Sequence, residues 1–163
     1  MMPGKSKTMA ERILIVDDDK RVLEGLERML HGEFAVETAS SGTEGIATIH
    51  LFGPFAIVVS DMRMPGLDGT GFLDRVRELA PHTVRMLLAG HKDLDRAIAA
   101  VNEGRIFRCL TKPFEGEEML DALRLGLAQY RANVEDGESV KEARACRLSL
   151  AGEASREIWV VRR

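Results

Sequence analysis

The sequence predicts an α/β domain in which helices cover both faces of a five-stranded parallel sheet. Two observations carry this prediction. Short runs of consecutive apolar residues, typical of strands buried on both faces, recur along the chain. Between them lie segments whose apolar residues repeat every three or four positions, as in amphipathic helices. Strict alternation of strand and helix implies a parallel sheet with right-handed crossovers.

Five segments predict the strands. Arg12–Val16 (RILIV) and Phe55–Ser60 (FAIVVS) are continuously apolar, as expected of central strands, whereas Phe34–Thr38 (FAVET) alternates. The remaining strands are expected at Thr83–Leu88 and Ile106–Leu110. The pattern is that of a flavodoxin-like, doubly wound (βα)5 fold with strand order 2-1-3-4-5, which binds ligands at the carboxyl ends of its strands.

Five helices are predicted to follow the strands in turn. They are expected at Asp19–His31, Ser41–Phe52, Thr70–Leu79, Leu94–Asn102 and Glu115–Asn133. Gly32 follows the first of them and Pro54 closely follows the second, and both residue types end helices. Either Ser40 or Ser41 can cap the second helix, and the sequence leaves this choice open.

Composition limits the classes of partner. The chain has 163 residues, is 45% hydrophobic and 30% charged, and carries a net charge of −3. This charge gives no electrostatic basis for binding nucleic acid, and no apolar run approaches the roughly 20 residues of a membrane span. We therefore expect no nucleic acid and no membrane among the partners. Cys109 and Cys146 form no paired motif, which favours a cytoplasmic protein without a zinc site or disulfide.

The chain is expected to hold one domain with two flanking segments. Residues 1–10 are predicted to be a disordered leader, and residues 11–133 form the domain. Residues 134–163 are predicted to be a partly ordered extension that is too short for a separate domain. Its apolar end, Ile158–Val161, is either part of that extension or docks on the core or on a second copy of the chain.

Acidic residues gather where the predicted strands end. Asp17 and Asp18 follow the first strand, Asp61 follows the third, and Lys112 follows the fifth. The carboxyl ends of parallel strands share one edge of a sheet, so these side chains are expected to converge. Carboxylates packed this closely repel each other, and a hard cation such as Mg²⁺ resolves the repulsion with oxygen ligands.

This group of residues suits phosphoryl chemistry. Asp18 and Asp61 are candidates for direct Mg²⁺ ligation, Asp17 for ligation through water, and the main-chain carbonyl of Arg63 for a further ligand. Lys112 is a point charge suited to a phosphoryl oxygen, and an aspartate is a competent nucleophile toward phosphorus. Each feature alone has a simpler explanation, such as a helix N-terminus or a turn cap. Their order along the strand ends favours a shared site.

Three motifs resemble the receiver domain of two-component response regulators. They are Ile13–Asp19 (ILIVDDD), Val58–Gly69 (VVSDMRMPGLDG) and Leu110–Phe114 (LTKPF), and the resemblance covers about residues 11 to 133. The stretch Leu87–Phe114 is also similar to receivers fused to cyclic di-GMP phosphodiesterase (HD-GYP) or related output domains. The resemblance implies a signalling module rather than a metabolic enzyme.

The resemblance also implies a role for each matching residue. Asp61 is the expected phosphoacceptor, Asp17 and Asp18 the acidic pair that holds Mg²⁺, and Lys112 the lysine that contacts the phosphate. The bond between Lys112 and Pro113 is expected to be cis. The phosphate donor is expected to be a sensor histidine kinase or a phosphotransfer protein.

The sequence departs from the family at two positions. Receivers normally carry serine or threonine at the end of the fourth strand, where this chain has Ala89, although Gly90 can still offer its backbone N–H to a phosphoryl group. The family tends to place an aromatic residue at the position of Cys109. Phe107 is expected on the same face of the strand, two residues earlier. The residues for phosphorylation are thus present, while those that pass on the signal are altered.

Three functions follow as hypotheses. The first is a phospho-acceptor module whose surface at Asp93–Asn133 binds an effector or a second receiver, with a homodimer as one outcome. The second is an interaction module that works without phosphorylation. The third is a Mg²⁺-dependent phosphohydrolase, which needs a second aspartate two residues after the nucleophile, where this chain has Arg63. Arg63 and His91 are close enough in sequence to the site to tune the lifetime of a phosphoryl group.

Overall fold

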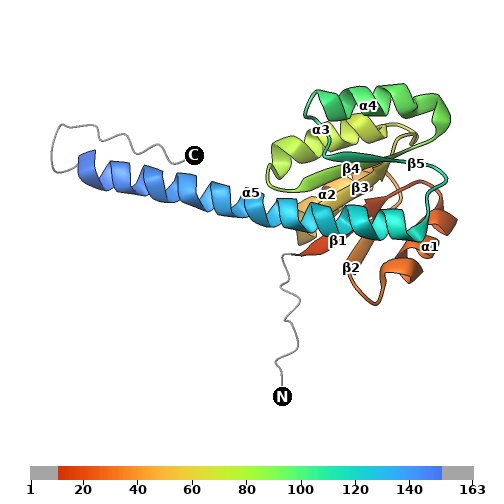
Figure 1. The fold of residues 1–163 in the computed structure, drawn as a ribbon, viewed down its shortest axis with the longest axis horizontal. Coiled ribbons are helices and arrows are strands. Elements are labelled where there is room, and N and C mark those ends of the chain that lie inside the picture. Colours follow the sequence, from red (N-terminus) through yellow and green to blue (C-terminus); the bar gives the residue numbers. More distant parts are fainter. Residues whose placement is uncertain (1–10, 152–163) are drawn as a thin grey trace, which may run out of the picture.

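A parallel sheet of five strands forms the centre of the computed structural model, which describes residues 11–151, with side chains as far as Glu138 (Figure 1). The strand order is β2-β1-β3-β4-β5, which confirms the predicted topology. The strands are β1 (Arg12–Val16), β2 (Ala35–Ala39), β3 (Ile57–Asp61), β4 (Val84–Ala89) and β5 (Arg108–Thr111).

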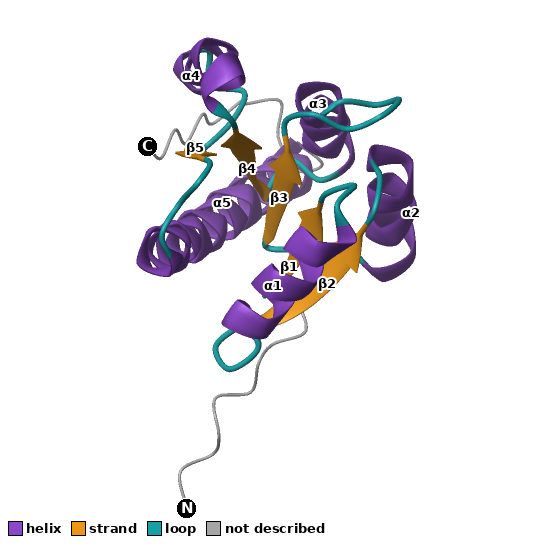
Figure 2. Ribbon diagram, turned by 90° about the vertical axis from the view of Figure 1, so that its right-hand side faces the viewer, coloured by secondary structure: helices purple, strands orange, loops and turns teal. Residues whose placement is uncertain are grey.

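The helices lie on both faces of this sheet (Figure 2). They are α1 (Lys20–Leu30), α2 (Gly42–Phe52), α3 (Gly69–Leu79), α4 (Leu94–Asn102) and α5 (Gly116–Ala151), and the short 3-10 helix η1 (His91–Asp93) precedes α4. Helices α1 and α5 pack on one face, and α2, α3 and α4 cover the other. Alternate residues of β1 point to opposite faces of the sheet. Ile13 and Ile15 pack in the core beneath α1 and α5, and Leu14 and Val16 pack in the core beneath α2, α3 and α4.

The cap of α2 is settled by its hydrogen bonds. Ser41 is the N-cap, and its hydroxyl accepts the backbone N–H of Glu44 at 3.1 Å. The Glu44 carboxylate reaches back to accept the backbone N–H and the hydroxyl of Ser40. Both serines therefore help to fix the start of α2, with Ser41 in the capping position.

The start of β5 differs from the prediction. The strand begins at Arg108 rather than Ile106, because Ile106 and Phe107 still belong to the connection that leaves α4. Phe107 packs with the core beneath α1 and α5, whereas Cys109 packs with the core beneath α2, α3 and α4. The expectation that Phe107 shares the face of Cys109 is therefore wrong, since strand alternation does not extend back to Phe107.

The end of the last helix also differs from the prediction. Helix α5 does not stop at Asn133 but continues to Ala151 and projects past the sheet (Figure 1). No proline interrupts this stretch, and Gly137 meets the ring of His82, where a Cβ atom would lie 2.6 Å from the imidazole carbon Cε1. The Asn133 side chain donates to the carbonyl of His82 at 3.0 Å. The helix is thus tied to the loop before β4 beyond its predicted end.

Two predictions on the termini lie outside the described residues. They are the disordered leader at residues 1–10 and the docking of Ile158–Val161. Within the described part of the chain, residues 134–151 are helical, so the predicted boundary at residue 133 is not a break in secondary structure.

The turn from β3 into α3 requires glycine at two positions. Gly66 has a φ of +78°, which side chains rarely adopt. At Gly69, a Cβ atom would collide with the carbonyl oxygen of Asp61 and lie 2.9 Å from the Cα of Met62. Asp68 caps the helix by accepting the N–H of Gly71 at 2.8 Å. The backbone of Gly69 therefore packs directly against the backbone of Asp61 and Met62.

We predict that Gly69→Ala destabilises the fold by about 1–3 kcal/mol, because neither backbone group at the contact can move freely. Gly25→Ala is the matched control, since a Cβ atom there meets nothing within 4 Å in the middle of α1. That control is expected to stabilise by roughly 0.5–1 kcal/mol through helix propensity. Urea denaturation of both variants measures the difference, and equal stabilities would contradict the proposed contact.

Candidate functional site

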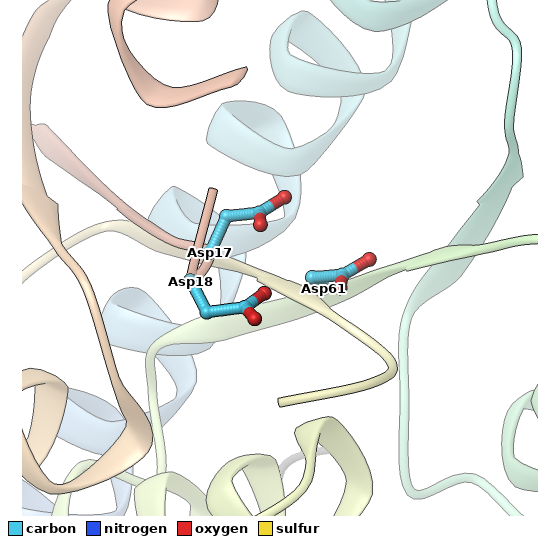
Figure 3. A group of neighbouring side chains, drawn as sticks. All are labelled: Asp17, Asp18 and Asp61. Atoms are coloured by element: carbon cyan, nitrogen blue, oxygen red, sulfur yellow. The ribbon is translucent and has the colours of Figure 1, made fainter. Parts of the chain in front are cut away.

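Three carboxylates meet at the carboxyl edge of the sheet (Figure 3). Asp17 and Asp18 follow β1, and Asp61 is the last residue of the neighbouring strand β3. One ligand atom from each lies within 4.8 Å of the others, and the three side chains point to the same side. The parallel strand ends thus produce the juxtaposition that the sequence predicts.

Asp17 is the buried member of the group, with 1% of its surface exposed. Its backbone N–H donates to the carbonyl of Ala39, and its carboxylate accepts the N–H of Asp19 at 2.9 Å. Burial raises the pKa of Asp17, although the N–H of Asp19 and the charge of Lys112 act against that rise. The charged form of Asp17 is therefore held at a cost in free energy.

Lys112 supplies one positive charge against these three carboxylates. Its Nζ lies 2.7 Å from Oδ1 of Asp61 and 3.4 Å from Oδ2 of Asp17. Its backbone N–H donates to the carbonyl of Ala89 at 2.8 Å, and the bond to Pro113 is cis, as expected. Burial by itself would lower the pKa of Lys112, but the two carboxylates outweigh it and raise the pKa.

The group of acids fits Mg²⁺. Its donors are carboxylate oxygens, which hard divalent cations prefer, and they converge from two strand ends. Lys112 brings one positive charge to three carboxylates, so the group keeps an excess of negative charge. Asp18 is exposed, so the group opens to solvent on one side. A cation can therefore reach it without displacing core side chains.

An ion pair that the sequence did not predict lies beside the acids. Met62 and Met64 are buried, so Arg63 between them points outward. Its guanidinium donates twice to Asp93, from Nε at 2.6 Å and from Nη2 at 3.1 Å. These bonds lower the pKa of Asp93. In the sequence Asp93 resembles a helix N-cap, yet it makes no side-chain cap bond to α4, so only the tertiary structure reveals its partner.

A hollow of about 440 Å³ lies over this side of the site. It is lined by Asp61, Met62, Arg63, Gly90, His91, Lys92 and Asp93. Gly90 and His91 thus reach the same hollow as Asp61, and Arg63 also lines a second hollow that contains Asp18. All the predicted site residues thus lie around one region of the structure, namely Asp17, Asp18, Asp61, Arg63, Gly90, His91 and Lys112.

The two altered positions lie behind that region. Ala89 ends β4 and is fully buried, and its methyl side chain has no donor for a group on Asp61. Cys109 is partly buried next to the same core, and burial raises the pKa of its thiol. A small apolar side chain and a thiol thus occupy the two places where the resemblance implies a hydroxyl and an aromatic ring.

Comparison with known sequences decides the family. The profile of the response regulator receiver domain matches residues 13–124. The chain belongs to the response regulator receiver family. Receiver domains are signalling modules, and phosphorylation and Mg²⁺ binding are general properties of the family.

The curated relatives that this chain matches are longer regulators. It is 40% identical over 112 residues to the hydrogenase transcriptional regulatory protein HoxA of Cupriavidus necator, covering 69% of this chain and 23% of that protein. It is 33% identical over 154 residues to the response regulator protein FleR of Pseudomonas aeruginosa, covering 91% and 32%. The chain thus spans between about a quarter and a third of the length of these relatives.

This chain matches one solved structure over almost the whole length of that structure. The structure described as adenylate cyclase from Rhodopirellula baltica is 41% identical, with a TM-score of 0.78, and the match covers 80% of this chain and 97% of that one.

Among residues 11–151, every helix is too short or too polar to span a lipid bilayer.

We predict that Asp17→Asn raises the melting temperature of the metal-free receiver at pH 7. The raised pKa means that the folded protein holds a proton more tightly than the unfolded chain, so ionised Asp17 lowers stability above that pKa. The effect is absent below the ordinary pKa of an aspartate. Asparagine keeps the oxygen that accepts from Asp19 and removes the charge.

Thermal unfolding with EDTA and with Mg²⁺ measures this effect. For the unsubstituted receiver, Mg²⁺ at a hundredfold excess over Kd is expected to stabilise by about 2.7 kcal/mol. Asp17→Asn is expected to lose most of that gain. A lower melting temperature in EDTA would contradict the free-energy cost of ionised Asp17, and an unchanged response to Mg²⁺ would contradict its role in holding the ion.

Proposed function

We propose that the chain is a phospho-acceptor signalling module in which Asp61 takes a phosphoryl group from a histidine kinase or a phosphotransfer protein. The observation that carries this proposal is the position of Lys112, which contacts Asp61 at 2.7 Å within the group of acids. A carboxylate oxygen of Asp61 attacks phosphorus while the bond to the donor imidazole breaks, and the imidazole nitrogen keeps the electron pair.

Each neighbouring group has a role in this transfer. Asp17, Asp18, Asp61 and the main-chain carbonyl of Arg63 would hold Mg²⁺, which when bound balances the charge of the transferring group. Lys112 binds a phosphoryl oxygen as a point charge. The N–H of Gly90, which lines the same hollow as Asp61, donates to another oxygen.

The output surface of this module is formed by α4, β5 and α5, over Asp93–Asn133. Two large apolar side chains on it are exposed, Ile98 by 46% and Leu125 by 49%. Such exposed apolar groups suit an effector or a second receiver, which makes a homodimer one outcome. The cysteine usage supports a cytoplasmic location, and the net charge of −3 supports partners other than nucleic acid. The module is not a metabolic enzyme.

The first test is mass spectrometry after treatment with acetyl phosphate and Mg²⁺. We expect one phosphoryl adduct on the unsubstituted protein and none on Asp61→Asn, because that variant lacks the nucleophilic oxygen. Lys112→Gln is expected to form the adduct more slowly. An adduct that persists in Asp61→Asn would place the acceptor elsewhere.

The switch of this module is proposed to be altered at Ala89 and Cys109. Ala89→Thr restores a hydroxyl, and Ala89→Val has the same shape without one. Because a hydrogen bond to a charged group contributes about 1.5–3 kcal/mol, the threonine variant is expected to bind beryllofluoride, a phosphoryl mimic, roughly tenfold or more tightly than the valine variant. Fluorine NMR titration measures both affinities. Equal affinities would show that a hydroxyl at this position adds nothing.

A second function is favoured by the same two residues. Without the hydroxyl and the aromatic ring, this function is an interaction module whose affinity for its partner does not depend on phosphorylation. In that case a captured partner binds the unsubstituted protein and Asp61→Asn equally, with or without acetyl phosphate. Under the first proposal, phosphorylation changes that affinity and Asp61→Asn does not respond.

A further inference from the structure

The ion pair between Arg63 and Asp93 connects two loops beside the acceptor. Arg63 lies in the connection from β3 to α3, two residues after Asp61, and Asp93 is the last residue of η1, directly before α4. The guanidinium uses two nitrogens for the two oxygens of one carboxylate. Such a paired geometry fixes both partners in orientation as well as in distance. The start of α4 is therefore anchored to the loop that carries the acceptor.

The two partners differ in exposure. The side chain of Asp93 is 7% exposed, whereas that of Arg63 is 69% exposed. A nearly buried carboxylate depends on its partner, because a buried charge left unpaired is strongly destabilising. The exposed guanidinium, in contrast, can turn toward another anion. Arg63 is thus the partner that can move, and Asp93 the partner that must respond.

The hollow beside Asp61 determines which anion Arg63 would meet. Asp61, Arg63 and Asp93 all line it, so a phosphoryl group on Asp61 lies in the space that Arg63 borders. Arginine binds phosphoryl oxygens with the same paired geometry that it uses for carboxylates. Ala89, at the end of β4, offers no side-chain donor in this place.

Asp93 also occupies the N-cap position of α4. It precedes the first turn of α4, whose backbone N–H groups lack partners within the helix. In the unmodified protein Asp93 does not cap that helix, and its backbone (φ −107°, ψ 2°) lacks the extended conformation typical of a cap. Its N–H instead donates to the carbonyl of Gly90 at 3.1 Å. An Asp93 released by Arg63 can therefore turn to cap α4, which avoids an unpaired carboxylate.

We propose that Arg63 is a two-position switch residue, which holds Asp93 in the unmodified protein and binds the phosphoryl group once Asp61 is modified, so that Asp93 is released to cap α4. This inference rests on the proposed phosphorylation of Asp61. It assigns to Arg63 and Asp93 the coupling between acceptor and α4 that Ala89 cannot provide by a hydroxyl. Arg63 acts here as a positioning residue for the start of α4.

Binding of the phosphoryl group and formation of the Arg63–Asp93 ion pair oppose each other in this switch. Since Asp93 and the phosphoryl group compete for one guanidinium, removal of the Asp93 charge must strengthen binding of the phosphoryl group. Asp93→Asn is therefore expected to bind beryllofluoride about fivefold or more tightly than the unsubstituted protein. An asparagine can also cap α4, so this variant is expected to show the released arrangement before any ligand is added.

The experiment is NMR of the full chain with Mg²⁺, before and after beryllofluoride. Fluorine spectra report the bound mimic, the Nε–H signal of Arg63 reports its partner, and the amides of residues 93–96 report the start of α4. In the unsubstituted protein we expect all three to change together. In Asp93→Asn the amide signals of residues 94–96 are expected near their bound positions from the outset.

Two further variants keep the test decisive. Arg63→Lys, on an exposed position, keeps the charge but lacks the paired donors, and at saturating beryllofluoride it is expected to lose the response of residues 93–96. Arg124→Lys is the matched control, because Arg124 makes the same two-nitrogen pair with Glu33 and does not line the hollow beside Asp61. It is expected to keep the response.

The outcomes separate the two proposals. No bound fluorine signal in the unsubstituted protein would overturn the phosphorylation of Asp61, and the switch with it. A bound signal with unchanged Arg63 Nε–H and unchanged residues 93–96 would overturn the switch alone. Equal or weaker binding of beryllofluoride to Asp93→Asn would also overturn it, since competition requires the opposite sign.

Discussion

Repulsion among three carboxylates at one edge of the sheet is the constraint on which the rest of this site depends. Asp17 and Asp61 come from adjacent parallel strands, so the fold itself forces them together. Lys112 reaches both but cannot neutralise the group, and burial raises the pKa of Asp17. The receiver thus gathers an excess of negative charge at one edge of its sheet, an arrangement that suits a divalent cation and is common at functional sites.

Close main-chain contacts hold the backbone around Asp61. Gly69 lets the start of α3 pack against the carbonyl of Asp61, and the N–H of Lys112 donates to the carbonyl of Ala89. Buried Met62 and Met64 hold the intervening turn on the core. Asp61 and Lys112 are therefore positioned by main-chain contacts, which leaves exposed side chains such as Arg63 as the parts of this edge that can move.

The sequence predicted those features that depend on local pattern and on strand order. Apolar periodicity located the strands, and the shared edge of parallel strands was sufficient to predict that Asp17, Asp61 and Lys112 converge. The same reasoning did not predict the pairing of Arg63 with Asp93, because the residues are 30 positions apart and each has an adequate local explanation. The packing of Phe107 was missed for the same reason, since it depends on tertiary contacts. Helix α5 was predicted too short because the composition changes after Asn133, although no proline interrupts residues 134–151.

Charge pairs connect the loops around Asp61. Lys112, after β5, contacts carboxylates at the ends of β3 and β1, and Arg63, after β3, contacts Asp93 before α4. Four of the five strand ends are thus joined through two cations around Asp61. A phosphoryl group there would attract both cations at once. Because Lys112 is held by its backbone and Arg63 is exposed, the attraction would act on Arg63 first, and the buried carboxylate of Asp93 would carry the change to α4.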